Sequence, residues 1–126
     1  MTAASRAWGP LSADVRRALE LVLHEDTDAH RAYRAQLPYA EMAEGCTCPC
    51  RSKYLRVDRT AAPAAPPRGD SPVVASRLVV DEAGEVLGEA LVFDWSRDGY
   101  VEELELALWE DAERLVGPLA ERIADS

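Results

Sequence analysis

Residues 85–109 read EVLGEALVFDWSRDGYVEELELALW, and this stretch decides the fold class. Asp98-Gly99 is a strong turn signal, and it separates two runs that are rich in apolar residues. The first run, residues 85–95, predicts a strand with an apolar face that Glu89 interrupts, made of Leu87, Leu91, Phe93 and Trp95. A strand, a turn and a second apolar run in succession indicate an antiparallel sheet.

The second run, residues 100–109, also predicts a strand. Leucines at 104, 106 and 108 alternate with Glu103 and Glu105, and a period of two is typical of a strand. A helix is the alternative, because one helical stripe holds Val101, Leu104, Leu108, Ala112 and Leu115. The preceding turn and the alternation favour the strand, and the sequence alone leaves both interpretations open.

Upstream of this hairpin, a valine-rich run at residues 73–80 and a turn at residues 81–84 add a third strand, which completes an antiparallel meander. Residues 61–70 contain three prolines and predict an extended surface loop. Residues 53–57 predict a fourth strand. Residues 39–45 fit either a short strand or an extended connector.

The N-terminal part predicts two short amphipathic helices. Ser12 is a good N-cap for a helix over residues 12–24. Asp26 or Thr27 caps a second helix that ends at Leu37, because Pro38 disfavours helical geometry in the residue before it. Two such helices joined by a tight turn indicate an αα-hairpin.

Together these elements predict a single α+β domain over residues 1–126. The αα-hairpin packs on an antiparallel sheet of about four strands. Residues 1–10 form a loose lead-in, and residues 110–124 form a C-terminal helix that is interrupted at Gly117-Pro118.

The charge distribution is uneven. The net charge is −9, and residues 71–126 carry four basic and fourteen acidic side chains. Such a surface repels nucleic-acid phosphates and favours either solubility or a basic protein partner. No apolar run approaches the ~20 residues of a membrane span, and no secretory signal begins the chain, so we expect a cytoplasmic protein without membrane contact.

The most distinctive motif is a run of three cysteines, Cys46, Cys48 and Cys50, around Pro49. Thiolates bind zinc, although this spacing requires the chain to curl and a fourth ligand, for which His24 and His30 are the imidazole candidates. The alternatives are three small buried side chains that begin a strand, or thiol chemistry. A Cys–His nucleophilic pair lacks an accompanying oxyanion feature.

Residues 36–57 and 85–109 resemble a group of small actinobacterial proteins of unknown function. The matching residues are the cysteine run with the preceding Gly45, the Asp98-Gly99 turn and the Leu104-Glu105 pair. Pro49 departs from that group, in which a glycine often lies between the second and third cysteines. The resemblance implies a cysteine run that leads into a sheet, and it implies no activity.

No phosphate-binding loop, zinc-protease motif or serine-hydrolase motif occurs, so the sequence favours a non-catalytic protein over an enzyme. The first hypothesis is an immunity-like or adaptor-like module that binds a basic protein through Glu102, Glu103, Glu105 and Trp109. The alternative is a metal- or thiol-dependent protein that uses the cysteine run; zinc is then the cofactor, and no other cofactor is expected. An enzyme of unrecognised type is the third hypothesis, and a homo-oligomer is compatible with all three. Because aromatic residues are few, we expect Trp95, Tyr100 and Trp109 to be buried.

Overall fold

The computed structural model describes residues 7–44, 51–67, 69–109 and 112–124. Both predicted helices form, and each begins at a hydroxyl side chain. Helix α1 (Ala13–Val22) is capped by Ser12, whose Oγ accepts from the Val15 N–H. Helix α2 (Asp28–Gln36) is capped by Thr27, whose Oγ1 accepts from the His30 N–H. Helix α2 ends at Gln36, one residue before the predicted end, but Leu37 keeps helical angles despite Pro38, and the chain continues into a 3-10 turn, η1 (Leu37–Tyr39).

The strands join one antiparallel sheet in the described part of the chain. Its order is β1-β2-β3-β6-β5-β4. The strands are β1 (Gly9–Pro10), β2 (Ala40–Glu44), β3 (Lys53–Val57), β4 (Val73–Val80), β5 (Val86–Phe93) and β6 (Glu103–Leu108). The α+β class, the meander β4-β5-β6 and the strand at residues 103–108 are confirmed. The prediction of about four strands was too low, because residues 40–44 pair as a strand and the expected lead-in contributes β1.

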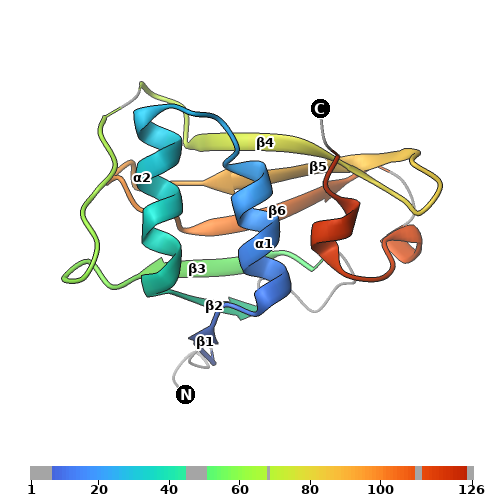
Figure 1. The fold of residues 1–126 in the computed structure, drawn as a ribbon, viewed down its shortest axis with the longest axis horizontal. Helices are drawn as coiled ribbons and strands as arrows, with labels where there is room; N and C mark the ends of the chain where they lie inside the picture. The colour runs from blue at the N-terminus through green and yellow to red at the C-terminus, as the bar shows by residue number, and fades with distance from the viewer. Residues whose placement is uncertain (1–6, 45–50, 68, 110–111, 125–126) are drawn as a thin grey trace, which may run out of the picture.

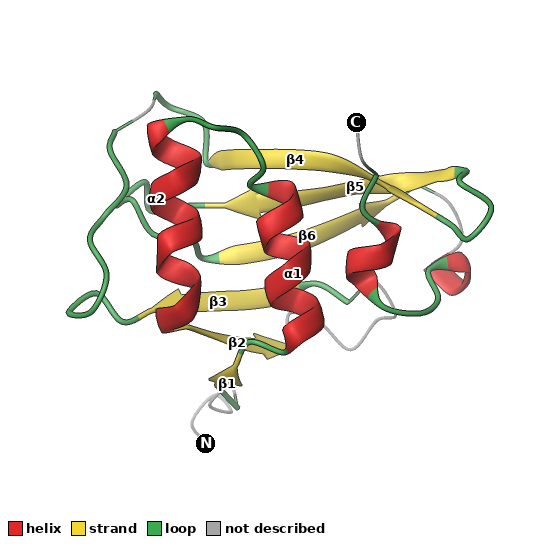
Figure 2. Cartoon of the chain, in the orientation of Figure 1, coloured by secondary structure: helices red, strands yellow, loops and turns green. Residues whose placement is uncertain are grey.

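The two helices lie side by side across one face of the sheet (Figure 1). Their buried side chains join those of the strands in one core, which includes Leu19 on α1, Tyr33 on α2 and Val92 on β5. The same separation into a helical layer and a sheet layer appears in Figure 2. Within the described residues, none of the helices has the length and apolar character needed to cross a membrane.

A β-bulge in β5 changes which side chains share a face. Val80 pairs with Val86 and Val79 pairs with Gly88, so Leu87 is an extra residue. Leu87 is therefore fully buried with the core, whereas Leu91 stays half-buried on the other face. The sequence predicted one common face for Leu87, Leu91, Phe93 and Trp95. That prediction was wrong for Leu87, which lies on the opposite face. Strict alternation cannot anticipate a bulge.

The connection between β5 and β6 is wider than the predicted Asp-Gly turn. It spans residues 94–102 and is closed by the Glu102 N–H, which donates to the Phe93 carbonyl. The Asp94 carboxylate accepts from the N–H groups of Asp98 and Gly99. Gly99 has a φ of 92°, and a Cβ there would lie 2.7 Å from the Ala65 carbonyl oxygen. A glycine is required both by the backbone and by the approaching proline-rich loop.

That proline-rich loop packs against the β5–β6 connection through buried polar groups. The Gln36 amide nitrogen donates to the carbonyls of Pro63 and Gly99, and its oxygen accepts from the Val101 N–H. The Tyr100 hydroxyl donates to the Ala62 carbonyl. The expected surface loop is thus anchored at Ala62 and Pro63 to the β5–β6 connection and to α2.

The predicted C-terminal helix was wrong. Residues 112–124 form two short 3-10 turns, η2 (Ala112–Arg114) and η3 (Leu119–Arg122). Gly117 adopts a φ of 76° and Pro118 follows it, so an α-helix cannot continue through this point. The segment is held by the Asp14 carboxylate, which accepts from the N–H groups of Leu119 and Ala120, and by an antiparallel bridge between Ile123 and Val79.

Candidate functional site

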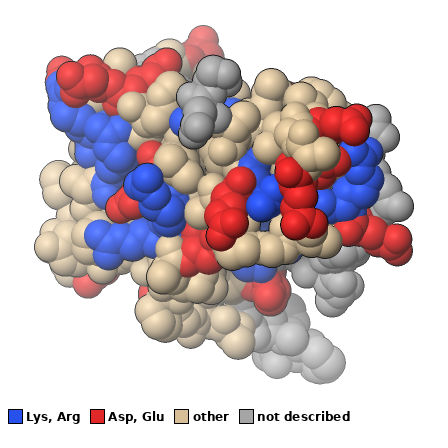
Figure 3. All heavy atoms as spheres, turned by 45° about the vertical axis from the view of Figure 1, so that its right-hand side comes forward, with Lys and Arg blue, Asp and Glu red and all other residues tan. Residues whose placement is uncertain are grey.

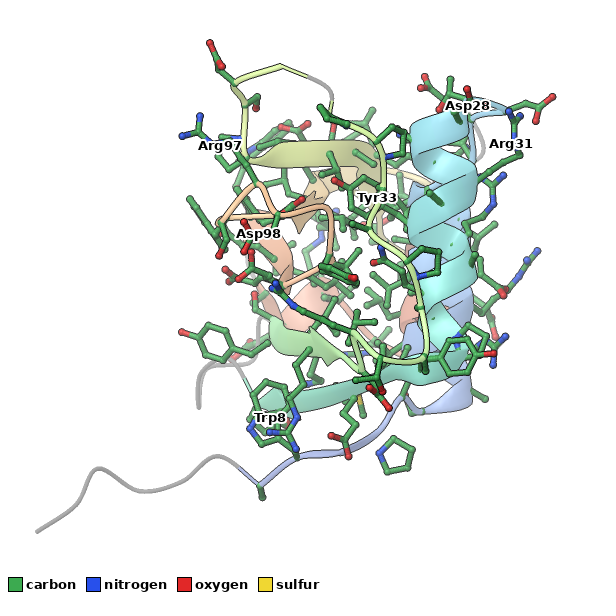
Figure 4. All side chains as sticks on the ribbon, turned by 90° about the vertical axis from the view of Figure 1, so that its left-hand side faces the viewer. Trp8, Asp28, Arg31, Tyr33, Arg97 and Asp98 are labelled. Carbon is green, nitrogen blue, oxygen red and sulfur yellow. The ribbon has the colours of Figure 1, made fainter. Side chains whose placement is uncertain are left out.

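One face of the sheet carries the helices, and the opposite face is the candidate site. In Figure 4 the helices lie to the right of the sheet, and no described helix lies on its left. The register and the alternation along the strands identify the side chains on this outer face. On β4, β5 and β6 they are Ser76, Leu78, Val80, Val86, Glu89, Leu91, Phe93, Glu103, Glu105 and Ala107. The outer face is therefore a mixture of apolar side chains and glutamates.

The glutamates of the outer face lie close together. Glu105 pairs directly with Leu91, and Glu89 is the diagonal neighbour of Glu105 because Glu89 pairs with Ala107. Glu103 follows two residues from Glu105 on the same strand and also faces outward. On β4, β5 and β6 no described basic residue points to this face, because Arg77 lies on the helical side and donates to the Leu21 carbonyl. The central outer face is therefore acidic.

An exposed tryptophan lies at each end of this acidic region. Trp95 follows β5 and is 51% exposed, and Trp109 follows β6 and is 61% exposed. Trp109 lies six positions beyond Glu103, the partner of Phe93, so the two ends lie roughly 20 Å apart at the usual rise of a strand. The expected burial of both tryptophans was wrong, whereas Tyr100 is buried as predicted. The indoles extend beyond the ends of β5 and β6, where the helical layer does not reach them.

Trp95 belongs to a small ordered group. Its indole stacks on the Phe93 ring, with centroids 4.3 Å apart and planes 3° apart. Its Nε1–H donates to Glu103 Oε1 at 2.8 Å. The indole is therefore fixed in orientation, and one of its faces is covered by Phe93.

The predicted partner residues Glu102, Glu103, Glu105 and Trp109 do not act alike. Glu103, Glu105 and Trp109 lie on the outer face. Glu102 points away from it, and its carboxylate accepts from the Ser96 N–H and hydroxyl, which closes the β5–β6 connection. Sequence reasoning missed Trp95 and Glu89. The alternation that placed Glu105 outward signals Glu89 as well, because the two occupy neighbouring strands on one face.

The three cysteines of the predicted metal site, Cys46, Cys48 and Cys50, lie outside the described residues. The imidazole candidates differ. His24 is exposed, but His30 is buried, and both of its ring nitrogens are engaged. His30 Nδ1 accepts from the Glu25 N–H at 3.1 Å, so Nε2 carries the proton and donates to the Val74 carbonyl at 3.0 Å. In the described ranges, no group of three His, Cys, Asp or Glu side chains is arranged to hold a metal ion.

A cleft of about 510 Å³ lies at one end of the sheet, between the proline-rich loop and the β5–β6 connection. Tyr33 projects into this region from α2, and Arg97 and Asp98 lie on the opposite side (Figure 4). The buried polar groups of the cleft bond to one another. The Tyr33 hydroxyl donates to Asp94 at 2.8 Å, and Asp94 also accepts the two N–H groups of its own turn. These bonds hold the β5–β6 connection against α2.

Two carboxylates have lowered pKa values, and both lie in turns away from the outer face. The pKa of Asp81 falls below its ordinary value because its side chain accepts from the Glu85 N–H, from Arg114 and from the Ala83 N–H. The pKa of Asp58 falls because its side chain accepts from the hydroxyl and the N–H of Thr60. Both are explained by turn geometry.

The helical side of the molecule differs in charge pattern. There, basic and acidic side chains lie intermixed (Figure 3). Arg16 and Arg17 each lie within ion-pair distance of Glu20, and Arg31 bonds to Asp26 and Asp28. On β4, β5 and β6 the outer-face glutamates thus have no described basic partner, whereas Arg56 on β3 pairs with Glu41, and the acidic side chains named on the helical side pair with arginines.

Comparisons with known proteins add no function to this geometry. The resemblance of the cysteine run and the Asp-Gly hairpin to small actinobacterial proteins stays a prediction. No protein-family model, curated protein or solved structure matches this chain.

Proposed function

We propose that the protein is a non-catalytic binding module whose outer sheet face docks a basic protein. The observation that carries the proposal is the sheet face that no described helix covers, on which an exposed tryptophan lies at each end of an acidic region. Tryptophan is enriched among the residues that dominate interface energies, because it buries a large rigid surface. Glutamates between two such anchors select a partner of opposite charge and increase its association rate.

The alternation of residue types supports an extended contact. Apolar side chains at Leu78, Leu91 and Ala107 are direct cross-strand neighbours of Glu89 or Glu105, so a partner surface can bury apolar area while its basic side chains meet the carboxylates. The area between the tryptophans is about as long as a six-residue strand. A bound segment of that length would place alternate side chains onto the face.

The arrangement of the other polar groups also favours binding over catalysis. Asp94, Tyr33 and Gln36 are buried and hydrogen-bonded to structural partners. The lowered pKa values belong to Asp81 and Asp58, which cap turns. We therefore place the function on the surface of the sheet.

The experiment begins with capture of proteins from the cell that encodes the chain, followed by purification of the retained partner. Its dissociation constant is then measured at two salt concentrations against two triple variants of equal charge. The outer-face variant is Glu89→Gln, Glu103→Gln and Glu105→Gln. The control variant is Glu20→Gln, Glu82→Gln and Glu121→Gln, at residues off the outer face.

We expect the outer-face variant to weaken binding about tenfold or more and to reduce the salt dependence, because close charge pairs at an interface contribute most of both. The control variant should change the affinity by less than about threefold, since its charges are distant from the contact. A purified partner that binds both variants alike would contradict the proposal.

A further inference from the structure

Two arginines of this chain, Arg56 and Arg59, each lie over an aromatic ring and beside a carboxylate. The Arg56 guanidinium lies 4.4 Å from the centre of the Trp8 ring and bonds to Glu41 at 2.8 Å. The Arg59 guanidinium lies 4.4 Å from the centre of the Tyr100 ring and reaches Asp98 at 3.3 Å. In both cases an aromatic ring supplies the face and a carboxylate supplies the charge.

Trp95 and Glu103 form a third pair of the same kind. The two side chains are joined by the bond from indole Nε1–H to Glu103 Oε1, so ring and carboxylate are held together. Phe93 covers one face of the indole, and the exposed fraction of 51% shows that much of the residue remains open to solvent. Within the described ranges, no arginine or lysine lies over this ring or pairs with Glu103.

We infer that Trp95 and Glu103 form a docking site for one arginine side chain of the basic partner; this inference rests on the proposed function. A guanidinium is planar, stacks on an aromatic face and donates from a fork to a carboxylate. Glu103 Oε1 accepts from the indole, which leaves Oε2 to accept from the arriving guanidinium. Lysine fits less well, because its compact ammonium does not stack.

The contact between Trp95 and Glu103 favours binding because both side chains are already held in place before an arginine arrives. The indole is fixed by the stack on Phe93 and by its bond to Glu103, so an arriving arginine loses its own freedom but does not have to order the site. At the Arg56 site the aromatic ring and the carboxylate come from different segments of the chain, whereas Tyr100 and Asp98 both belong to the β5–β6 connection. Trp95 and Glu103 likewise come from one hairpin.

The probe is the capped tripeptide Gly-Arg-Gly, titrated into ¹⁵N-labelled protein while the three indole N–H signals are recorded. Capped Gly-Lys-Gly and Gly-citrulline-Gly are the controls, since citrulline keeps the shape of arginine and removes its charge. We expect the arginine peptide to shift the Trp95 indole signal most, with saturation at millimolar concentration as for a single exposed contact. The signals of Trp8 and Trp109 should move less.

Glu103→Gln is the decisive variant, because glutamine still accepts the indole N–H but lacks the charge. It should raise the dissociation constant of the arginine peptide roughly threefold or more, while Glu105→Gln leaves it within about twofold. An unmoved Trp95 signal, an equal shift with the citrulline peptide, or an unchanged constant in Glu103→Gln would overturn the inference. If the Trp95 indole signal does not shift while binding of the purified partner still requires the outer-face glutamates, the arginine site is disproved and the proposed function is retained.

Discussion

The side-chain amide of Gln36, at the end of α2, donates to the carbonyl of Gly99 at 2.6 Å. The same amide accepts from the Val101 N–H and donates to Pro63, so one fully buried side chain joins the helical layer, the β5–β6 connection and the proline-rich loop. This bond holds the end of the sheet from which Trp95 projects. The outer face therefore depends on polar contacts beneath it.

Replacing Gln36 tests that dependence. Gln36→Ala should lower the free energy of unfolding by about 2–4 kcal/mol, because it leaves the Val101 N–H buried without an acceptor and opens a cavity. Urea denaturation measures the loss. Glu20→Gln, at a half-buried position of α1 where only solvent-accessible ion pairs to Arg16 and Arg17 are lost, should change stability by less than about 1 kcal/mol. Equal stability of the two variants would show that the amide contacts contribute little.

Asp14 should control whether the C-terminal segment stays docked. Its carboxylate accepts from the N–H groups of Leu119 and Ala120 at 2.7 and 2.8 Å. Asp14→Ala should speed hydrogen exchange at these two amides by about tenfold to a hundredfold, since bonds to a charged acceptor are strong. Asp28→Ala removes the matching acid from the first turn of α2 and should leave both amides protected. Unchanged exchange in Asp14→Ala would contradict the docking contact.

Stability in acid should depend on Asp81. Its pKa is lowered from 3.8, so this carboxylate stabilises the fold above that value and stops doing so as the pH falls through the lower folded pKa. The urea midpoint of the wild-type protein should therefore fall more steeply than that of Asp81→Asn between about pH 5 and pH 2. Glu82→Gln, in the same turn, should keep the wild-type slope. Parallel curves for the wild-type protein and Asp81→Asn would refute the linkage.

The β-bulge requires a glycine at position 88. A Cβ there would lie 2.1 Å from the Ala107 carbonyl oxygen and 2.7 Å from Leu108 Cα, both of which are backbone atoms. Gly88→Ala should destabilise the protein by at least about 2 kcal/mol or prevent folding, because β6 must move. Gly9→Ala meets nothing within 4 Å and should be tolerated. Similar urea midpoints for both variants would disprove the close approach.

The local parts of the fold were predictable from the sequence because they depend on neighbouring residues. Ser12 and Thr27 cap their helices through their own side chains, and the Leu-Glu alternation at residues 103–108 sets the faces of β6. These signals act over a few residues. They suffice for the helices and for the meander.

The remaining features depend on contacts distant in the sequence. The bulge at Leu87 becomes visible only when β4 is paired with β5, and β1 exists only because β2 offers it an edge. Near the C-terminus the helical pattern does not form a helix, because Gly117 and Pro118 interrupt it and Asp14 binds the backbone N–H groups of the segment. Composition predicted buried tryptophans, but the helical layer covers one face of the sheet only.

The most direct test of the claim that the outer face binds a basic protein is the affinity of the partner for a variant without Trp95 and Trp109. The double variant Trp95→Ala/Trp109→Ala should weaken binding of the purified partner by about 2 kcal/mol or more, as expected for aromatic anchors. Tyr39→Ala removes an aromatic residue that is 49% exposed and directly precedes β2, two strands away from β6 in the sheet, and it should leave the affinity unchanged. A double variant that binds as tightly as the wild-type protein would contradict the claim.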